Sequence, residues 1–264
     1  MSKGSGQSRR PGLRGPARKI AGYVFAIVVL LLGWHLTALA VDSPALPTPM
    51  QTIPVFLEFA PELLPQFWVS LYRIVAALAI ACALATPLGL ALGRLRRLDA
   101  WVAPVLYLAY PIPKIVLLPV LLVLFGLGDG PKVALIALTL FFQILVSMRD
   151  ATRLVPEEVI LSARSLGARR WGLYRHVILP AVLPELFTAL RVGSGIAVAI
   201  LFLAEAIAGS TGLGYFIVDA WAMIDYPRMF AGIIAMAILG VLIYEVIEIA
   251  EARLTRWRKA GRAG

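Results

Sequence analysis

Charged residues are scarce in this chain. They make up 15% of its 264 residues, whereas hydrophobic residues make up 60%. A soluble domain of ordinary composition carries about 25% charged residues, so this composition excludes a water-soluble protein and predicts an integral membrane protein. Cysteine is scarcer still, since Cys82 is the single one and no disulfide can form within the chain.

Histidine is almost absent as well. His35 and His176 are the only two, and no spacing of Cys and His typical of a metal site occurs. The sequence also lacks the G-x-x-x-x-G-K-[ST] loop that holds nucleotide phosphates. No His/Asp cluster, metal set or pairing of a nucleophile with a base lies in or near the apolar runs, which disfavours a membrane-embedded enzyme.

Positive charge, by contrast, is plentiful, with a net charge of +10. The basic residues lie in clusters between apolar runs rather than on one polar domain, so they indicate membrane topology and not a nucleic-acid partner. Residues 1–19 carry six basic residues and no acidic one. We expect a flexible arm there that stays on the cytoplasmic side.

The first apolar run, residues 20–41, has the roughly 20 residues that a membrane-spanning helix needs. Ala38-Leu39-Ala40 could serve as a signal-peptide cleavage site, but the run is longer than the roughly 7–15 apolar residues of such peptides. We therefore predict an uncleaved transmembrane helix. Residues 42–68 contain six prolines, which predict an external elbow with at most a short helix near 55–60.

The second predicted span, residues 69–93, carries a small residue at every fourth position. These residues are Ala77, Ala81, Ala85, Gly89 and Gly93. Such a stripe permits close approach of another helix; the alternative is an alanine-rich helix without a particular partner.

The third predicted span, residues 101–125, contains four prolines and is expected to be kinked and interior. Lys114, near its middle, either snorkels to the interface or faces a hydrated path. Three further spans, at residues 133–148, 186–208 and 229–250, complete a five-helix core over residues 69–250. In the fifth span Ala189, Gly193 and Ala197 form a second small-residue face.

The distribution of Lys and Arg sets the orientation. Of the 25, 20 fall in four segments that this topology places on one side: the arm, residues 94–97, residues 149–175 and the tail, residues 251–264. The positive-inside rule then predicts six spans with both termini in the cytoplasm. The loop at residues 149–185 becomes cytoplasmic.

Within that loop, residues 156–184 form the longest polar interruption of the later part of the chain. Pro156, Glu157 and Glu158 predict a helix start, and Gly167 predicts its end. Val159, Ala163 and Leu166 are expected to share one apolar face. A second helical stretch is expected from residue 169 to about 176, after which Pro180 and Pro184 turn the chain toward the membrane. A loop lying on lipid phosphates is the alternative interpretation.

The spacing in this segment resembles the EAA loop of ABC-transporter permeases. The matching positions are Leu161-Ser162-Ala163, then Gly167, then Val177 and Leu179-Pro180. Two positions depart from the motif, because Leu161 replaces its acidic residue and Ser162 replaces its first alanine.

Five further segments resemble, in the same order, the binding-protein-dependent permeases of the nitrate/sulfonate/taurine branch, aliphatic sulfonate permeases among them. They are Leu46-Pro47-Thr48-Pro49, Ser70-Leu71-Tyr72-Arg73, Pro111-Ile112-Pro113-Lys114, Ala163-Arg164-Ser165-Leu166-Gly167 and Gly212-Leu213-Gly214-Tyr215. The resemblance implies an all-α polytopic membrane protein with the six transmembrane helices of a type I ABC importer permease.

The resemblance also implies partners. They are a second copy of the permease, a cytoplasmic ATPase dimer that holds the ATP and Mg, an external solute-binding protein and membrane lipid. This chain itself would need no cofactor and would not be an enzyme. Contact with the ATPase is expected from Glu157, Glu158, Ser162, Ala163, Arg164, Ser165, Leu166, Gly167 and Ala168.

The residues that line the substrate path are less defined by the sequence. Lys114, Ser194, Glu205, Thr211 and Tyr215 are the candidates, and Glu205 resembles an acidic position before the family's Gly-Leu-Gly. A buried ion pair of Glu205 with Lys114 or Arg73 is the alternative. The branch implies import of a small anion such as an alkanesulfonate, taurine or nitrate; a pyrimidine-like vitamin precursor is the second candidate. A secondary transporter is disfavoured, because inverted repeats are not evident.

Overall fold

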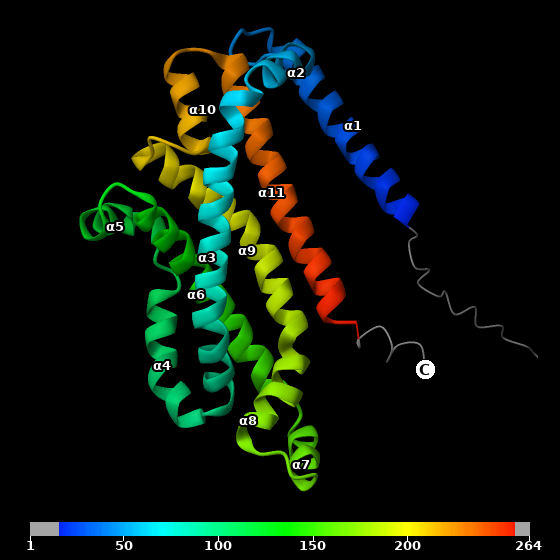
Figure 1. Cartoon of the computed structure of the whole chain (residues 1–264), viewed down its shortest axis with the longest axis vertical. Helices are drawn as coiled ribbons and strands as arrows, with labels where there is room; N and C mark the ends of the chain where they lie inside the picture. Colours follow the sequence, from blue (N-terminus) through cyan, green and yellow to red (C-terminus); the bar gives the residue numbers. More distant parts are fainter. Residues whose placement is uncertain (1–15, 257–264) are drawn as a thin grey trace, which may run out of the picture.

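The computed structural model describes residues 16–256 and shows an all-helical chain over that range, drawn out along the direction of its long helices (Figure 1). Its elements, in order, are α1 (Pro16–Val41), α2 (Pro49–Glu58), α3 (Ala60–Arg94), α4 (Arg96–Ala109), the 3-10 turn η1 (Lys114–Leu117), α5 (Leu118–Phe125), α6 (Asp129–Arg153), α7 (Glu157–Ser165), α8 (Arg170–Leu173), the π-helical turn η2 (Tyr174–Ile178), α9 (Leu179–Ala208), α10 (Leu213–Ala222) and α11 (Tyr226–Leu254).

Five helices are long and apolar enough to cross a membrane: α1, α3, α6, the continuous α8–η2–α9 and α11. The pair formed by α4 and η1–α5, bent by 87°, makes a sixth if it is taken as one span. The expectation of an all-α polytopic membrane protein is therefore confirmed. Residues 1–15 of the basic arm and residues 257–264 of the tail lie outside the described residues.

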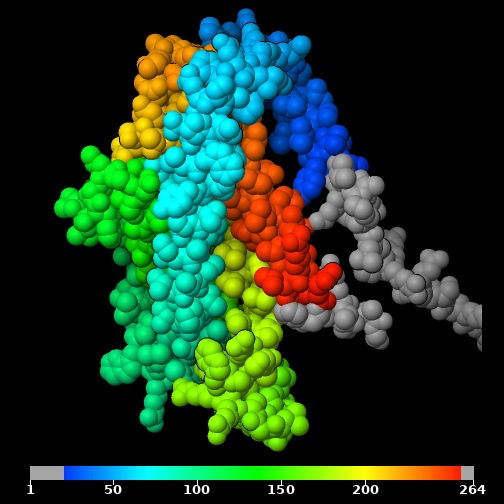
Figure 2. All heavy atoms as spheres, viewed as in Figure 1, coloured from blue at the N-terminus to red at the C-terminus, as the bar shows by residue number. Residues whose placement is uncertain are grey.

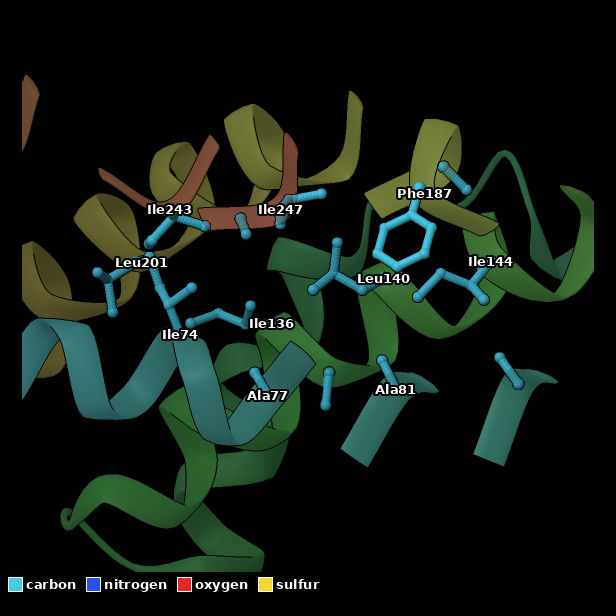
Figure 3. Close-up of a cluster of buried hydrophobic side chains, with 14 of the residues drawn as sticks. Ile74, Ala77, Ala81, Ile136, Leu140, Ile144, Phe187, Leu201, Ile243 and Ile247 are labelled. Carbon is cyan, nitrogen blue, oxygen red and sulfur yellow. The ribbon is translucent and has the colours of Figure 1, made fainter. Parts of the chain in front are cut away.

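The core forms where α3, α6 and α9 pack side by side, with α11 against α9 (Figure 1). Ala77 and Ala81 of α3 are fully buried against α6, and Figure 3 shows them beside Ile136 and Leu140. The predicted small-residue stripe therefore has a particular partner, and that partner is α6. Small side chains allow the two backbones to approach closely, which increases the dispersion contacts between the helices. These contacts matter because the hydrophobic effect does not drive helices together in lipid.

Glycines in this core have no room for a side chain. A Cβ at Gly93 of α3 would lie 2.4 Å from the Cβ of Thr152, and one at Gly89 would lie 2.5 Å from the Cβ of Met148. On α9, a Cβ at Gly193 would lie 2.8 Å from a methyl carbon of Leu140. Both small-residue faces that the sequence contains thus pack on α6.

The elbow expected at residues 42–68 is shorter than predicted. Helix α3 begins at Ala60 and runs through Pro65 without a break. Pro61 lies in its first turn, where backbone N–H groups have no partner within the helix and a proline costs little. The short helix also lies earlier than expected, because Thr48 and Gln51 form a capping box that starts α2 at Pro49.

The third predicted span is kinked, as expected, and much of its surface is exposed in the single chain. The chain breaks between α4 and η1 at Pro111 and Pro113, which lack the donors needed to continue the helix. Trp101 of α4 and Val123 of α5 are 83% and 86% exposed in the single chain. These helices lie on the flank of α6, where the core is already filled by α3 and α9 (Figure 1).

The fifth span begins well before the predicted residue 186. Helical structure is continuous from Arg170 to Ala208, so Pro180 and Pro184 lie within a helix rather than at a turn. The π-helical turn explains this, because the N–H of Leu179 bonds to the carbonyl of Tyr174 in the turn just before Pro180. A widened turn of this kind leaves room for the ring of Pro180 and does not require the backbone N–H that proline lacks.

Helix α1 stands apart from the others over most of its length (Figure 1). Near its end, the ring of Trp34 stacks on Phe230 with a centroid separation of 5.4 Å, and its indole N–H donates to the carbonyl of Pro47. The hydroxyl of Tyr23 donates to Glu245 of α11. These polar and aromatic contacts hold α1, whereas most of its apolar side chains from Tyr23 to Leu32 are exposed.

Candidate coupling helix and the polar network at the opposite end

Helix α7 protrudes at one end of the molecule, opposite the end that carries α2 and α10 (Figures 1 and 2). Pro156 precedes it, and Glu157 and Glu158 lie in its first turn, where the helix dipole favours negative charge. Gly167, with φ of +87°, ends it. The N–H of Gly167 bonds to the carbonyl of Arg164, and that of Ala168 bonds to Ala163, which is a Schellman cap.

The face that α7 buries differs from the predicted one. Ile160 is buried and Ala163 partly so, both in the core that includes Leu173. Val159 and Leu166 are exposed, Leu166 by 89%. The predicted face grouped residues by helical spacing alone, but tertiary contact with α8 decides which side is covered. The exposed side of α7 therefore carries apolar groups, of which Leu166 is the least covered.

Polar side chains along α7 are satisfied by their own helix. The hydroxyl of Ser162 donates to the carbonyl of Glu158 at 2.8 Å, and that of Ser165 donates to Ser162 at 2.8 Å. The guanidinium of Arg164 is exposed. The nine residues expected to contact an ATPase thus lie on one short helix and its cap.

A single arginine ties the base of α7 to α3. The Arg94 guanidinium donates to the carbonyl of Val155 at 2.8 Å and lies 3.7 Å from the carboxylate of Glu157. The start of α7 is therefore held against the end of a core helix.

At the opposite end, a network of charged groups surrounds Glu205 of α9. Its carboxylate is 0% exposed and accepts bonds from the Arg73 guanidinium at 2.6 Å, the Ser70 hydroxyl at 2.9 Å and the N–H of Gly214 at 2.8 Å. Arg73, only 2% exposed, also binds Asp129 at 2.6 Å. Of the two ion-pair partners proposed for Glu205, Arg73 is the one observed.

The same network holds the loop before α10. Arg73 donates to the carbonyl and the hydroxyl of Thr211 at 2.8 and 2.9 Å. Gly212, with φ of +107°, has no space for a side chain, since a Cβ would lie 2.3 Å from the Glu205 carboxylate. Four elements, α3, α6, α9 and α10, are therefore joined at one point.

The five candidates for the substrate path do not come together. Glu205 and Thr211 share the network, whereas Lys114 donates to the carbonyls of Ala109 and Tyr110 at 2.7 and 2.6 Å and so caps α4. The Ser194 hydroxyl bonds to the carbonyl of Arg191 in its own helix. Tyr215 is half-buried on α10.

Several polar residues of the fold were not singled out by sequence reasoning. Ser70 and Asp129 complete the network, and Lys132 is 2% exposed and donates to the carbonyl of Gly128. At the α7 end, Arg149 and Arg153 of α6 both bind Asp99 of α4. One sequence feature could have pointed to these residues. Single charged residues lie at the ends of apolar runs, and charged residues in such places tend to form buried pairs.

A comparison with protein families shows which class of protein this chain belongs to. Residues 85–256 match the family described as the binding-protein-dependent transport system inner membrane component, so the chain belongs to this family. It is therefore a permease component rather than an enzyme, and a multi-pass protein of the inner membrane. The sequence resemblance to such permeases is confirmed.

Among its relatives, the taurine transport system permease protein TauC of Escherichia coli is 33% identical over 95% of this chain and 94% of that protein. The putative aliphatic sulfonates transport permease protein SsuC of Bacillus subtilis is 29% identical over 93% and 91%. The formylaminopyrimidine transport permease protein ThiX of Halalkalibacterium halodurans is 30% identical over 88% and 94%.

Among solved structures, a chain of the MetNI methionine ABC transporter in an inward-facing conformation matches with a TM-score of 0.62. It covers 75% of this chain and 98% of that chain at 21% identity. This likeness shows the fold, that of a type I ABC importer permease.

Proposed function

We propose that this chain is the permease subunit of an ATP-driven importer, that two copies form the pore, and that α7 docks in a groove on a separate cytoplasmic ATPase. The observation that carries the proposal is the geometry of α7. It presents Leu161 and Leu166 outward, and its base is fixed to α3 by Arg94.

The connection from α7 to the membrane supports a lever. After the cap at Gly167, a helix runs without a break from Arg170 to Ala208 and packs on α6. A movement imposed on α7 would pass through the short link at residues 166–169 into this helix. Closure of the ATPase pair around ATP would then tilt α9, and the two sides of the pore would open in turn.

The proposed orientation places the α7 end and both termini in the cytoplasm. The charge distribution supports it, since Arg94, Arg96 and Arg97 lie at the α7 end, along with six basic residues at 149–175. The external binding protein would then meet the end that carries α2 and α10.

For the substrate, we propose a small anion such as taurine, an alkanesulfonate or nitrate. The similarity to TauC and SsuC supports this choice. A pyrimidine-like vitamin precursor is the second candidate, supported by the similarity to ThiX. Ser194 and Tyr215 stay as candidates for substrate contacts, whereas the bonds made by Lys114, Glu205 and Thr211 favour a structural role.

Docking is tested by co-purification of the ATPase with the permease. Leu166→Ser removes an exposed apolar group from α7 and is expected to lose most of the bound ATPase, as is deletion of residues 158–166. Met50→Ser is the matched control, because Met50 is 76% exposed at the opposite end. Equal ATPase recovery with all three variants, or transport by the single chain driven by an ion gradient, contradicts the proposal.

Substrate class is tested on the partner binding protein. Thermal unfolding of that protein is followed with taurine, an alkanesulfonate, nitrate or formylaminopyrimidine, because a ligand bound only by the native state raises the unfolding temperature. A shift with a sulfonate or nitrate supports the first candidate. A shift with the pyrimidine alone replaces it with the second.

A further inference from the structure

A large cavity opens beside α7, between the turn that joins α3 to α4 and the segment from α6 to α8. Its volume is about 1490 Å³. Six arginines line it: Arg94, Arg96, Arg97, Arg153, Arg164 and Arg170. Glu157 is the only acidic residue among the described residues that line it.

Most of this positive charge is uncompensated. Arg94 lies near Glu157, and Arg153 pairs with Asp99. The other four, Arg96, Arg97, Arg164 and Arg170, form no ion pair with any residue between 16 and 256. The Nε atom of Arg94 is buried and also lacks a hydrogen-bond partner within that range. Guanidinium groups gathered around one cavity repel one another, and an anion between them relieves the repulsion.

The rest of the lining is apolar. Leu92, Ile160, Leu173 and Ile178 are buried residues on its wall, and Leu154 lies at it with most of its side chain exposed. Leu92 belongs to the last turns of α3, a helix long enough to span the membrane. With the predicted span at residues 69–93, the cavity lies near the level at which lipid headgroups meet acyl chains.

We propose that this cavity binds the headgroup of an acidic glycerophospholipid. The phosphate oxygens would accept hydrogen bonds from the guanidinium groups, which match phosphate geometry in a bidentate manner. The first carbons of the acyl chains would lie on the leucine and isoleucine wall. A free phosphate satisfies the charge but leaves this wall uncovered, which is why the lipid is the favoured source. Basic pockets at the ends of transmembrane helices take such headgroups.

A lipid at this place would join two parts of the coupling region. Arg96 and Arg97 belong to the α3–α4 turn, whereas Arg164 and Arg170 flank the cap at Gly167. A headgroup bridging them would hold α7 against the core. This inference goes beyond the docking of an ATPase and does not depend on it, because the lipid would bind the permease alone.

The test is native mass spectrometry of the full chain, purified in neutral detergent, stripped of lipid and titrated with phosphatidylglycerol. Arg97→Gln combined with Arg170→Gln removes one guanidinium from each wall and is expected to weaken binding roughly thirtyfold, about fivefold for each arginine. Arg169→Gln combined with Arg175→Gln is the control. It removes the same charge from exposed residues outside the cavity and is expected to change binding less than threefold.

Further titrations distinguish the phosphate of a lipid headgroup from a soluble phosphate. Phosphatidylethanolamine with the same acyl chains, and glycerol 3-phosphate or inorganic phosphate, are expected to bind at least tenfold more weakly than phosphatidylglycerol. Arg97→Lys with Arg170→Lys is expected to keep most of the affinity, which shows that the glutamine variants lose charge rather than fold. Equal weakening by the cavity and control variants overturns the proposal, as does equal binding of a soluble phosphate. Unchanged lipid binding with reduced ATPase co-purification assigns the cavity to an acidic protein surface and also overturns it.

Discussion

At the scale of single residues, the molecule balances the charges that it buries. Arg73 and Lys132 are each 2% exposed; Arg73 pairs with the carboxylates of Glu205 and Asp129, and Lys132 donates to the carbonyls of Leu127 and Gly128. A buried charge without a partner is very costly, whereas a paired and hydrogen-bonded one persists. The pairing also fixes the loop at Thr211, so the network determines where α10 begins.

Replacing Glu205 by alanine is expected to be among the most destabilising single changes in the described chain. It leaves the Arg73 guanidinium with Asp129 as its remaining carboxylate partner and leaves the N–H of Gly214 unpaired, for a loss of about 3 kcal/mol in the free energy of unfolding. Thermal unfolding of the detergent-solubilised protein measures the loss.

Glu62→Ala is the control for that experiment. Glu62 also pairs with an arginine, Arg228, at 3.3 Å, but its side chain is 58% exposed. An exposed pair of this kind contributes about 0–1 kcal/mol. If both variants unfold at the same temperature, the buried network does not stabilise the fold.

At the scale of helices, the sequence predicts which face of α3 packs closely against another helix. A small residue every fourth position marks one face of α3, and Gly89 and Gly93 continue it to the α7 end. Such a stripe is local information, since helical spacing alone places its members on one face. The partner could not be identified in this way, because α6 is known only once the helices are packed.

Gly93→Ala tests this contact. The added methyl group would lie 2.4 Å from the Cβ of Thr152 and 2.7 Å from the carbonyl oxygen of Arg149, so α3 and α6 must separate. Overpacking of this kind costs about 1–3 kcal/mol. We expect a lower unfolding temperature in detergent.

Gly195→Ala is the matched control, because no atom lies within 4 Å of a Cβ at that position of α9. Alanine favours a helix over glycine by up to about 1 kcal/mol, so this variant is expected to unfold at the same or a higher temperature. If both variants lose the same amount of stability, the loss comes from replacing a helix glycine in general. The α3–α6 contact would then not be its cause.

Prolines indicated the ends of helices less reliably than the small-residue stripe indicated the packed face of α3. Pro61 and Pro65 lie at the start of α3, and Pro180 and Pro184 lie within the long helix. The cost of a proline depends on whether its missing donor was needed and whether the chain can widen around its ring. The bond from Leu179 to Tyr174 provides that widening, and nothing in the local sequence indicates it. By contrast, Pro111 and Pro113 do end a helix.

At the scale of the whole molecule, the two ends differ in kind. One end holds α7 and its arginine-lined cavity; the other holds α10 and the network of Glu205 (Figure 1). The bounds of α7 were predictable, because its start and its cap are encoded within eleven neighbouring residues, 157–167. The network was predictable only in part, since Ser70 and Glu205 are 135 positions apart. Bonds over such separations depend on the packed fold.

The proposed orientation of these ends is open to direct test with a single-cysteine series. Cys82 is the only native cysteine and lies half-buried in α3, so Cys82→Ala provides a cysteine-free background. On it, Ser165→Cys at the α7 end is expected to react with a membrane-impermeant maleimide only after the cytoplasmic face is opened. Met50→Cys on α2, exposed at the other end, is expected to react in intact spheroplasts. The positive-inside rule requires this order because the basic clusters flank α7 and not α2. Labelling of Ser165→Cys from outside, with Met50→Cys protected, would reverse the topology and remove α7 from the reach of any cytoplasmic ATPase.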